Sequence, residues 1–263
     1  MQISLLGSGS RGNSTLMKYD NFAFLIDAGL SGKQIIERLS THNISPTDLS
    51  GIIVTHEHID HIKSAGSLAR KWNLPIWTNR GTIENGKKYL DGIPEYNEIE
   101  VGKSFTICGL RADPFTVPHD AADPFGLIFT SENGYRIGFA TDMGFATRLA
   151  NEKLGGLQGL VLEFNHDSGM LLNGQYPWKV KQRIKSKLGH LNNEDAGILL
   201  QKIGGPELEW VVCAHISKEN NSESLIMKNV NKALQKKCEK DIKPQTKVCI
   251  ASQEKPTELL GFI

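Results

Sequence analysis

The stretch Thr55-His56-Glu57-His58-Ile59-Asp60-His61 follows a short apolar run, Gly51–Val54, that is typical of a buried β-strand. It holds three of the eight histidines of this 263-residue sequence within six positions, and two carboxylates lie among them. A polar loop would rarely reach this density of imidazole groups by chance. Imidazole and carboxylate ligands suit zinc, and also manganese or iron. The stretch therefore predicts a metal site at the end of a strand.

The spacing of the ligands within this stretch predicts two ions. His56 and His58 are two residues apart, so in an extended backbone their side chains point the same way and can bind one ion. Asp60 and His61 lie where the chain is predicted to turn into a helix, Ile62–Trp72, and can bind a second ion nearby.

Three further candidate ligands each follow a predicted strand: His119 after Leu110–Val117, Asp142 after Arg136–Ala140, and His215 after Trp210–Ala214. An alternative role for Asp142 is the N-cap of a helix over Ala146–Leu154. We expect His56, His58 and His119 to bind one ion, Asp60, His61 and His215 to bind the other, and Asp142 to bridge them.

This ligand set predicts hydrolytic chemistry. Each ion keeps open positions for water and substrate, as catalytic metals do. Two ions roughly 3.5–4 Å apart can share a hydroxide formed near neutral pH and clamp an in-line displacement at phosphorus. Glu57 and Ile59 alternate with the ligands and are expected to point away from the ions, so Glu57 is not the predicted general base.

The composition is that of an ordinary soluble globular protein, with 39% hydrophobic and 22% charged residues and a formal net charge of +1. A nucleic-acid partner would have to meet a local basic patch. Met1–Gly7 has no secretion-signal pattern, and no apolar run is long enough to span a bilayer. We expect a cytoplasmic protein without membrane contact, with reduced cysteines, because the four cysteines are scattered and form no CxxC motif. With no internal linker, residues 1–263 are predicted to form a single domain.

A glycine-rich stretch, Gly7-Ser8-Gly9-Ser10-Arg11-Gly12-Asn13-Ser14, follows the first predicted strand. Its exposed backbone N–H groups can hold an anion, although it matches neither a Walker A loop nor a dinucleotide fingerprint. A tight hairpin turn is the alternative. We expect Ser10, Arg11 and Asn13 to bind substrate. Asp27 ends a predicted hairpin, and the sequence leaves open whether it orients a ligand loop or caps a turn.

Polar and basic residues are also concentrated in the second half of the chain. Glu163-Phe164-Asn165-His166-Asp167 ends a predicted strand but matches no metal pattern, so we expect it to support the ligands or bind substrate through Asn165. Trp178–Lys187 is rich in lysine and arginine and is either a solvated helix face or a phosphate contact that weakens with salt. His190 precedes a predicted helix, which suits contact with a phosphate.

The series His56-x-His58-x-Asp60-His61, His119, Asp142 and His215 resembles the ligand series of the metallo-β-lactamase superfamily. Shorter motifs resemble its YycJ/WalJ branch, which is related to tRNase Z and RNase J: Ser8-Gly9-Ser10-x-Gly12-Asn13-Ser14, Glu163-x-Asn165-His166-Asp167, Tyr176-Pro177, Gly189-His190-Leu191 and His215-x-Ser217-x-x-Asn220-Asn221. The chain has His190-Leu191-Asn192-Asn193 where that branch usually has His-Leu-Ser-Asn.

The resemblance implies an α/β (α+β) fold, a four-layer αββα sandwich with a dinuclear site at the strand ends. It also implies a phosphodiesterase, most plausibly a DNA exonuclease, in which a metal-bridging hydroxide attacks phosphorus. His190 stands where the nuclease relatives have a histidine that assists proton transfer or holds the phosphate, and Asp60 and Asp142 complete the predicted catalytic set.

The implied cofactors are two divalent ions, with zinc favoured over manganese or iron. The implied partner is DNA rather than RNA, or a small phosphodiester, while the oligomeric state is left open. The alternatives are another hydrolase on the same scaffold, a glyoxalase II-like thioesterase or a lactonase, and a metal-dependent regulatory protein without turnover. The intact set of seven ligands disfavours the last of these.

Overall fold

A computed structural model of the chain describes residues 1–235 and 246–261. The chain divides into two compact units, Met1–Pro114 with Ala121–Phe125 and Ala251–Ile263, and Phe115–Asp120 with Gly126–Ile250. Both units contain β-strands in mixed orientation together with helices, as expected for the predicted fold class. The single domain over residues 1–263 stays a prediction.

The first unit is built on a seven-stranded sheet. Its strands are β1 (Gln2–Gly7), β2 (Ser14–Tyr19), β3 (Phe22–Ile26), β4 (Leu49–Ile53), β5 (Ile76–Thr78), β6 (Tyr96–Glu98) and β14 (Leu260–Gly261). Their order is β14-β1-β2-β3-β4-β5-β6. The pairs from β14 to β3 are antiparallel, whereas those from β3 to β6 are parallel. A hairpin of β7 (Phe105–Ile107) and β8 (Leu110–Thr116) follows, and β8 enters the second unit at Phe115.

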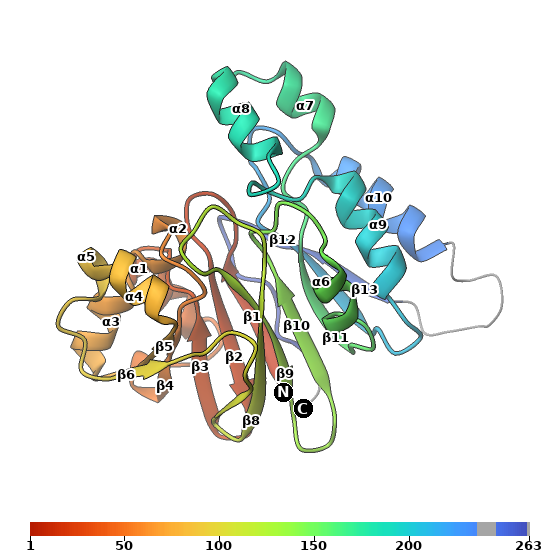
Figure 1. The fold of residues 1–263 in the computed structure, drawn as a ribbon. Helices are drawn as coiled ribbons and strands as arrows, with labels where there is room; N and C mark the ends of the chain where they lie inside the picture. Colours follow the sequence, from red (N-terminus) through yellow and green to blue (C-terminus); the bar gives the residue numbers. More distant parts are fainter. Residues whose placement is uncertain (236–245, 262–263) are drawn as a thin grey trace. The chain divides into compact units, whose positions relative to one another are not determined.

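Helices cover one face of this sheet. They are α1 (Gly32–Ser40), α2 (Ile59–Ile62), α3 (Ala65–Trp72), α4 (Arg80–Asn85) and α5 (Lys87–Leu90), with a 3₁₀ turn, η1 (Pro46–Asp48). Figure 1 shows α1, α3, α4 and α5 grouped beside the strands. Their apolar side chains, such as Ile35 and Leu68, share one buried cluster with Leu25 and Ile52 of the sheet. The sequence predicts a helix that starts at Ser31 and runs through Leu39, and Ser31 does cap α1 by accepting the amide of Gln34.

The helix predicted over Ile62–Trp72 is confirmed for Ala65–Trp72 but is interrupted near its start, at Lys63 and Ser64. A single helical turn, α2, already begins at Ile59 and ends at Ile62, and the next helix, α3, begins at Ala65. The amide of Ser64 is bonded to the carbonyl of Ala28, and its hydroxyl donates to the carbonyl of Leu30. These contacts with the loop after β3 replace the helical pattern, so tertiary structure overrides the local periodicity.

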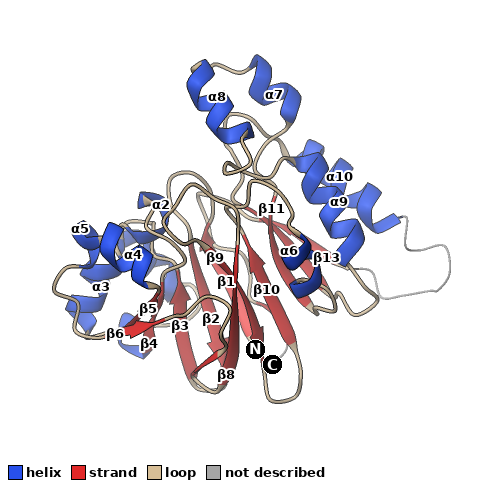
Figure 2. Cartoon of the chain, viewed as in Figure 1, coloured by secondary structure: helices blue, strands red, loops and turns tan. Residues whose placement is uncertain are grey.

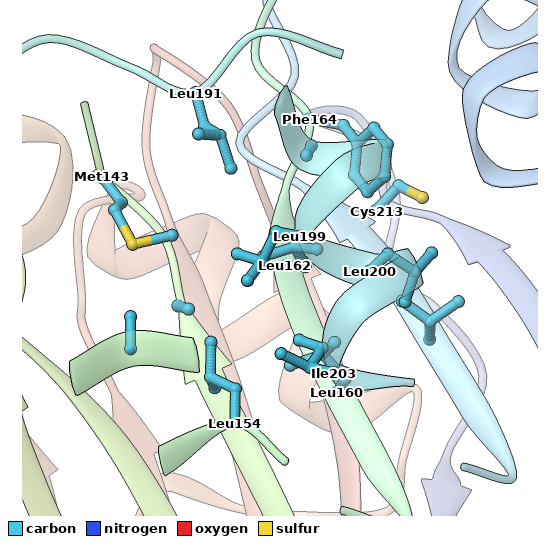
Figure 3. Packing of buried hydrophobic residues seen from close by; sticks show 14 of the residues in the cluster. Met143, Leu154, Leu160, Leu162, Phe164, Leu191, Leu199, Leu200, Ile203 and Cys213 are labelled. Carbon is cyan, nitrogen blue, oxygen red and sulfur yellow. The ribbon is translucent and has the colours of Figure 1, made fainter. Parts of the chain in front are cut away.

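The second unit is built on parallel strands. They are β10 (Arg136–Ala140), β11 (Gly159–Glu163), β12 (Trp210–Ala214) and β13 (Lys247–Ile250), and β9 (Phe125–Thr130) pairs antiparallel with β10. Its helices are α6 (Arg148–Lys153), α7 (Ser168–Asn173), α8 (Trp178–Lys185), α9 (Asn193–Ile203) and α10 (Glu223–Gln235). Figure 3 shows Leu199, Leu200 and Ile203 packed against Leu160 and Leu162. The core of this unit therefore lies between α9 and the sheet.

The helices α7 and α8 do not pack beside α9 and α10. Figure 2 shows α7 and α8 as a pair that stands apart from α9 and α10, at one end of the strands of this unit. The sequence of Ser222–Lys236 predicts a helix, which is observed as α10, and Lys236 lies outside the described residues. Cys108 and Cys213 are free thiols, as predicted, while Cys238 lies outside the described residues. Among residues 1–235 and 246–261, no helix combines the length and apolar character needed to cross a bilayer.

The carboxyl ends of β10, β11 and β12 bring three polar side chains to one edge. Asp142 and His215 follow β10 and β12, and Glu163 is the last residue of β11. Asp142 and His215 adopt left-handed backbone conformations, with φ of 56° and 52°. This conformation is uncommon for residues other than glycine and is often found at functional sites. The parallel arrangement therefore predicts a shared site at this edge.

A buried polar contact fixes the other end of this sheet. The hydroxyl of Tyr135 donates to Glu209 Oε2 at 2.9 Å and accepts from Trp210 Nε1 at 3.2 Å. We expect Tyr135→Phe to lower the free energy of unfolding by about 1–2 kcal/mol, because the buried Nε1–H group of Trp210 loses its acceptor. Chemical denaturation monitored by the fluorescence of tryptophan measures this. A variant as stable as the original protein would contradict the prediction.

Candidate metal centre

In the first unit, Asp27 determines the shape of the ligand loop. Its Oδ1 accepts the amide of Thr55 at 2.8 Å, and its Oδ2 accepts His61 Nδ1 at 2.7 Å. Asp27 thereby holds the first and the last residue of the stretch 55–61. It is 5% exposed and adopts a left-handed conformation with φ of 61°. Of the two roles that the sequence left open, orienting the ligand loop is the one its contacts support.

The same carboxylate also orients His56 through a chain of two hydrogen bonds. The hydroxyl of Thr55 donates to Asp27, at 2.9 Å from Oδ2, so its oxygen is left to accept from His56 Nδ1 at 3.1 Å. With Nδ1 protonated, the lone pair of each ring lies on Nε2. Both His56 and His61 therefore present Nε2 as the ligand atom, the arrangement that is usual for histidines that bind metals.

The glycine-rich loop packs directly against these ligands. Asn13 is 8% exposed, and its Nδ2 lies 3.3 Å from Asp60 Oδ2 and 3.1 Å from His61 Nε2. Its Oδ1 accepts the amide of Gly9 at 2.9 Å. A Cβ at Gly29 would lie 1.7 Å from the carbonyl oxygen of Asp60, so only glycine permits this approach. Asn13 thus positions ligands, and the substrate contact expected of it stays a prediction.

The two other substrate-binding residues expected from the glycine-rich stretch lie at the surface of this unit. Ser10 and Arg11 are exposed, and the guanidinium of Arg11 forms an ion pair with Glu254. Their expected contact with substrate stays a prediction. Glu57 Oε1 accepts the amide of Ala122 at 2.8 Å, which gives this carboxylate a structural partner. Ile59 is 57% exposed.

In the second unit, Asp142, Glu163, His190 and His215 each offer a ligand atom, and these atoms all lie within 4.8 Å of one another. Asp142 Oδ1 lies 3.4 Å from His215 Nε2 and 3.7 Å from His119 Nε2. One carboxylate oxygen therefore faces two imidazole nitrogens, as a bridging ligand would.

Glu163 is fully buried and makes four hydrogen bonds. Its Oε1 accepts from His190 Nδ1 at 2.8 Å and from His215 Nδ1 at 3.0 Å. Its Oε2 accepts the amides of Met143 and Leu191 at 2.9 and 3.1 Å. Burial alone would raise the pKa of Glu163, but the contacts with His190 and His215 outweigh it and lower the pKa to about 2. The carboxylate is therefore ionised at neutral pH and accepts a hydrogen bond from each of the two rings.

His119 is oriented by the loop that carries His190. Its Nδ1 lies 3.0 Å from the carbonyl oxygen of Gly189, and Nε2 is the atom that faces Asp142. The neighbouring residue, Asp120, binds Arg183 of α8 with both carboxylate oxygens, at 2.5 and 2.8 Å. His119, His190 and His215 thus all have Nδ1 next to a protein oxygen, as His56 and His61 do.

Asn165 contacts a predicted ligand instead of an open surface. It is 4% exposed, and its Nδ2 donates to the carbonyl oxygen of His215 at 2.8 Å. Its Oδ1 lies 3.2 Å from Nδ1 of His166, and burial lowers the pKa of His166 to about 4. The substrate contact expected of Asn165 stays a prediction, while the observed contact fixes the backbone of His215.

The structure brings together Asp60, His61, Asn13 and Asp27 in the first unit, and His119, Asp142, His190, His215 and Asn165 in the second. The sequence did not predict that Glu163 and Thr55 orient histidines. It also did not predict the ion pair of Asp120 with Arg183. The position of Glu163 at the end of a strand was the available signal. The others act through hydrogen bonds between distant residues, which no local pattern predicts.

We expect Glu163→Gln to reduce activity about 10- to 100-fold, the range for residues that orient metal ligands. The glutamine amide would face either two imidazole Nδ1–H groups or two backbone N–H groups. A ring that moves its proton from Nδ1 to Nε2 relieves the first conflict but can no longer bind metal. Hydrolysis rates of the metal-loaded protein test this, with Glu194→Gln on the exposed start of α9 as the control. Equal rates for the two variants would contradict it.

Residues 23–216 match the family described as the Beta-lactamase superfamily domain. The chain is 36% identical to Exodeoxyribonuclease YycJ of Bacillus anthracis over 90% of both chains. It is 37% identical to Exodeoxyribonuclease WalJ of Streptococcus pneumoniae over 84% of both. Among solved structures, the metallo-beta-lactamase fold protein YhfI of Bacillus subtilis aligns with a TM-score of 0.74 at 16% identity, covering 98% of this chain and 99% of that one. The predicted fold class is therefore confirmed.

Proposed function

The chain belongs to the metallo-β-lactamase superfamily, and from this premise we propose that it is a metal-dependent phosphodiesterase that degrades DNA as an exonuclease. The proposal assigns two divalent ions to His56, His58, Asp60, His61, His119, Asp142 and His215. Zinc is the favoured metal, with manganese or iron as alternatives. Two relatives named as exodeoxyribonucleases, over most of the chain, support DNA as the substrate rather than RNA or a small phosphodiester.

One observation carries the proposal: in five of the histidines, His56, His61, His119, His190 and His215, Nδ1 lies next to a protein oxygen. The partners are Asp27 for His61, Thr55 for His56, Gly189 for His119, and Glu163 for His190 and His215. Histidines in a merely polar loop have no reason to share one orientation. Together with Asp60 and Asp142, these rings form a donor set of nitrogen and oxygen atoms, which fits zinc, manganese or iron.

The bound ions would activate water and neutralise the charge on the phosphoryl oxygens. The residues supply orientation and proton transfer. Glu163 holds His190 by Nδ1, so Nε2 faces away from the carboxylate. In the doubly protonated ring, whose positive charge the Glu163 carboxylate would balance, Nε2–H can donate a proton to the leaving group or a hydrogen bond to the phosphate. Asp142 would fix the spacing of the ligands, and Asn13 holds Asp60 in place. Ser10, Arg11 and Asn165 are proposed substrate contacts, and we propose a cytoplasmic location.

Metal analysis and substrate comparison test this function. We expect about two ions per chain, as in dinuclear hydrolases, and hydrolysis of bis-p-nitrophenyl phosphate after addition of Mn²⁺ or Zn²⁺. Linear DNA with free or phosphorylated ends should be shortened from an end, while a closed circle should stay intact. Hydrolysis of thioesters or lactones without any cleavage of phosphodiesters would contradict the proposal, and a single ion per chain would contradict its dinuclear form.

A further inference from the structure

The segment Ser168–His190, which contains α7, α8 and the loop after them, is here named the arm. It carries five basic residues and no acidic residue, although the whole chain is nearly neutral. Figure 2 shows the two helices standing apart from the other helices of the second unit. The arm is thus a local basic region on the unit that carries Asp142, His190 and His215.

Two of the five basic side chains are used within the unit. Lys181 is 9% exposed, and its Nζ donates to the carbonyl oxygens of Leu172 and Gly174 at 2.8 and 2.6 Å, which fastens α8 to α7. Arg183 is paired with Asp120. The remaining three, Lys179, Lys185 and Lys187, are exposed to solvent. Three of the five basic side chains therefore remain for binding a ligand at the surface of the arm, and all three are lysines.

An exposed aromatic ring lies next to these lysines. Trp178, the first residue of α8, is 63% exposed. Trp178, Gln182 and Lys185 are spaced by four and three residues, so they lie along one side of the helix, and Lys179 is adjacent. A helix that only faces water gains nothing from an exposed indole. An aromatic face beside a row of cations is the arrangement that proteins use to bind single-stranded nucleic acid.

The arm is joined to the candidate metal centre by short backbone contacts. The amide of His190 donates to the carbonyl of Ile184 in the last turn of α8 at 2.9 Å, and the carbonyl of Gly189 contacts His119. A Cβ at Gly144, two residues after Asp142, would lie 2.3 Å from the carbonyl oxygen of Lys187. The loop after α8 is therefore packed against the predicted ligands, and a strand held on α8 would continue toward His190.

We propose that the arm holds the single-stranded end of a DNA substrate, with a base stacked on Trp178 and phosphates bound by Lys179, Lys185 and Lys187. The proposal rests on the proposed function, because it adds a binding surface for the same substrate. Negative phosphates complement the three exposed lysines, and the bases of an unpaired strand are the flat groups that can stack on the indole.

Binding of the full-length protein to a fluorescein-labelled thymidine oligonucleotide of about 16 nucleotides tests the stacking, a length taken from typical single-strand sites. Fluorescence anisotropy in EDTA measures binding without hydrolysis. Trp178→Ala should raise Kd about tenfold, whereas Trp178→Phe should retain most of the affinity because phenylalanine still stacks. Equal affinity of the alanine variant and the original protein would overturn the proposal.

The salt dependence of the same measurement tests the lysines. Lys185→Gln should reduce the slope of log K against log salt by about 0.7, the value for one phosphate contact of a single strand. Trp178→Ala should lower the affinity and leave the slope as it is. Lys202→Gln, which removes one charge at an exposed position of α9, is the matched control and should alter neither the affinity nor the slope. A slope that is the same for Lys185→Gln and Lys202→Gln would overturn the lysine assignment.

Two comparisons separate this proposal from its alternatives. Tighter binding of a uridine oligonucleotide or of blunt duplex DNA than of the thymidine oligonucleotide would contradict a single-stranded DNA end. With metal added, Trp178→Ala should also lower the rate on DNA relative to the rate on bis-p-nitrophenyl phosphate about tenfold, since the small ester cannot stack on the arm. Because the binding assay needs no catalysis, it remains decisive even if the protein proves not to be a nuclease.

Discussion

Asp142→Asn is expected to reduce phosphodiester hydrolysis about 1000-fold, which corresponds to about 4 kcal/mol of transition-state stabilisation. Asparagine is neutral, and its amide oxygen is a much weaker ligand than a carboxylate oxygen, so it is not expected to bridge two ions. The observed carboxylate has Oδ1 facing both His119 and His215. Asparagine also tolerates the left-handed backbone found at this position, so the fold should persist. Steady-state kinetics and metal analysis of the same sample measure the effect, and the metal content should fall toward one ion.

The control for this variant is Asp195→Asn, which removes the same charge from the exposed first turn of α9. It should retain activity and full metal content, with at most a small loss of stability at the start of the helix. If Asp142→Asn kept both its ions and its rate, Asp142 would not be the bridging ligand. Circular dichroism and thermal unfolding of both variants exclude a loss of fold as the cause.

Asp27→Ala is expected to have the largest effect on stability, about 3–5 kcal/mol, because buried polar groups lose their acceptor. The amide of Thr55 and Nδ1 of His61 would remain buried without the carboxylate that now binds them. Alanine in a left-handed conformation adds a strain of about 1 kcal/mol. Denaturant titration of the metal-free protein measures the loss, and His61 should no longer be held for metal binding.

Two further variants separate charge from backbone strain. Asp27→Asn tolerates the left-handed conformation and should chiefly weaken metal binding, by about 10- to 100-fold. Asp20 is a matched control, because it has φ of 49° but lies exposed in the turn between β2 and β3. Asp20→Ala should lower the free energy of unfolding only by the strain of alanine in the left-handed conformation, about 1 kcal/mol. Similar unfolding curves for Asp27→Ala and Asp20→Ala would mean that the carboxylate of Asp27 does not hold the loop.

The positions of several strands along the chain, and the polar residues at their ends, could be predicted from the sequence. Apolar runs such as Gly159–Leu162 and Trp210–Ala214 are short, and each is followed at once by polar side chains, so the strand and its end are both visible. The capped starts of α1 and α9, at Ser31 and Asn192, were equally predictable, because the capping side chain lies within three residues of the amide it accepts.

The groups that orient the ligands could not be predicted with the same certainty. Asp27 and His61 are 34 residues apart, and Glu163 and His215 are 52 apart. Such contacts form only once the strands are paired, so a pattern of neighbouring residues in the sequence cannot predict them. Lys181 illustrates the opposite error, since a lysine in a basic run is expected in solvent but here fastens α8 to α7. Whether a charged side chain is exposed or forms an internal hydrogen bond depends on the residues that the fold places beside it.

The first unit is discontinuous in sequence, and this has a consequence for synthesis. Its strand β1 pairs with β14, Ser4 donates to the carbonyl of Thr257, and Arg38 donates to the carbonyls of Gln253 and Glu254. These partners are made more than 200 residues after β1, once all of the second unit has been synthesised. The sheet that carries the ligand loop 55–61 is therefore completed only after residues 251–261 have been synthesised. Residues 126–235 of the second unit can begin to fold before that.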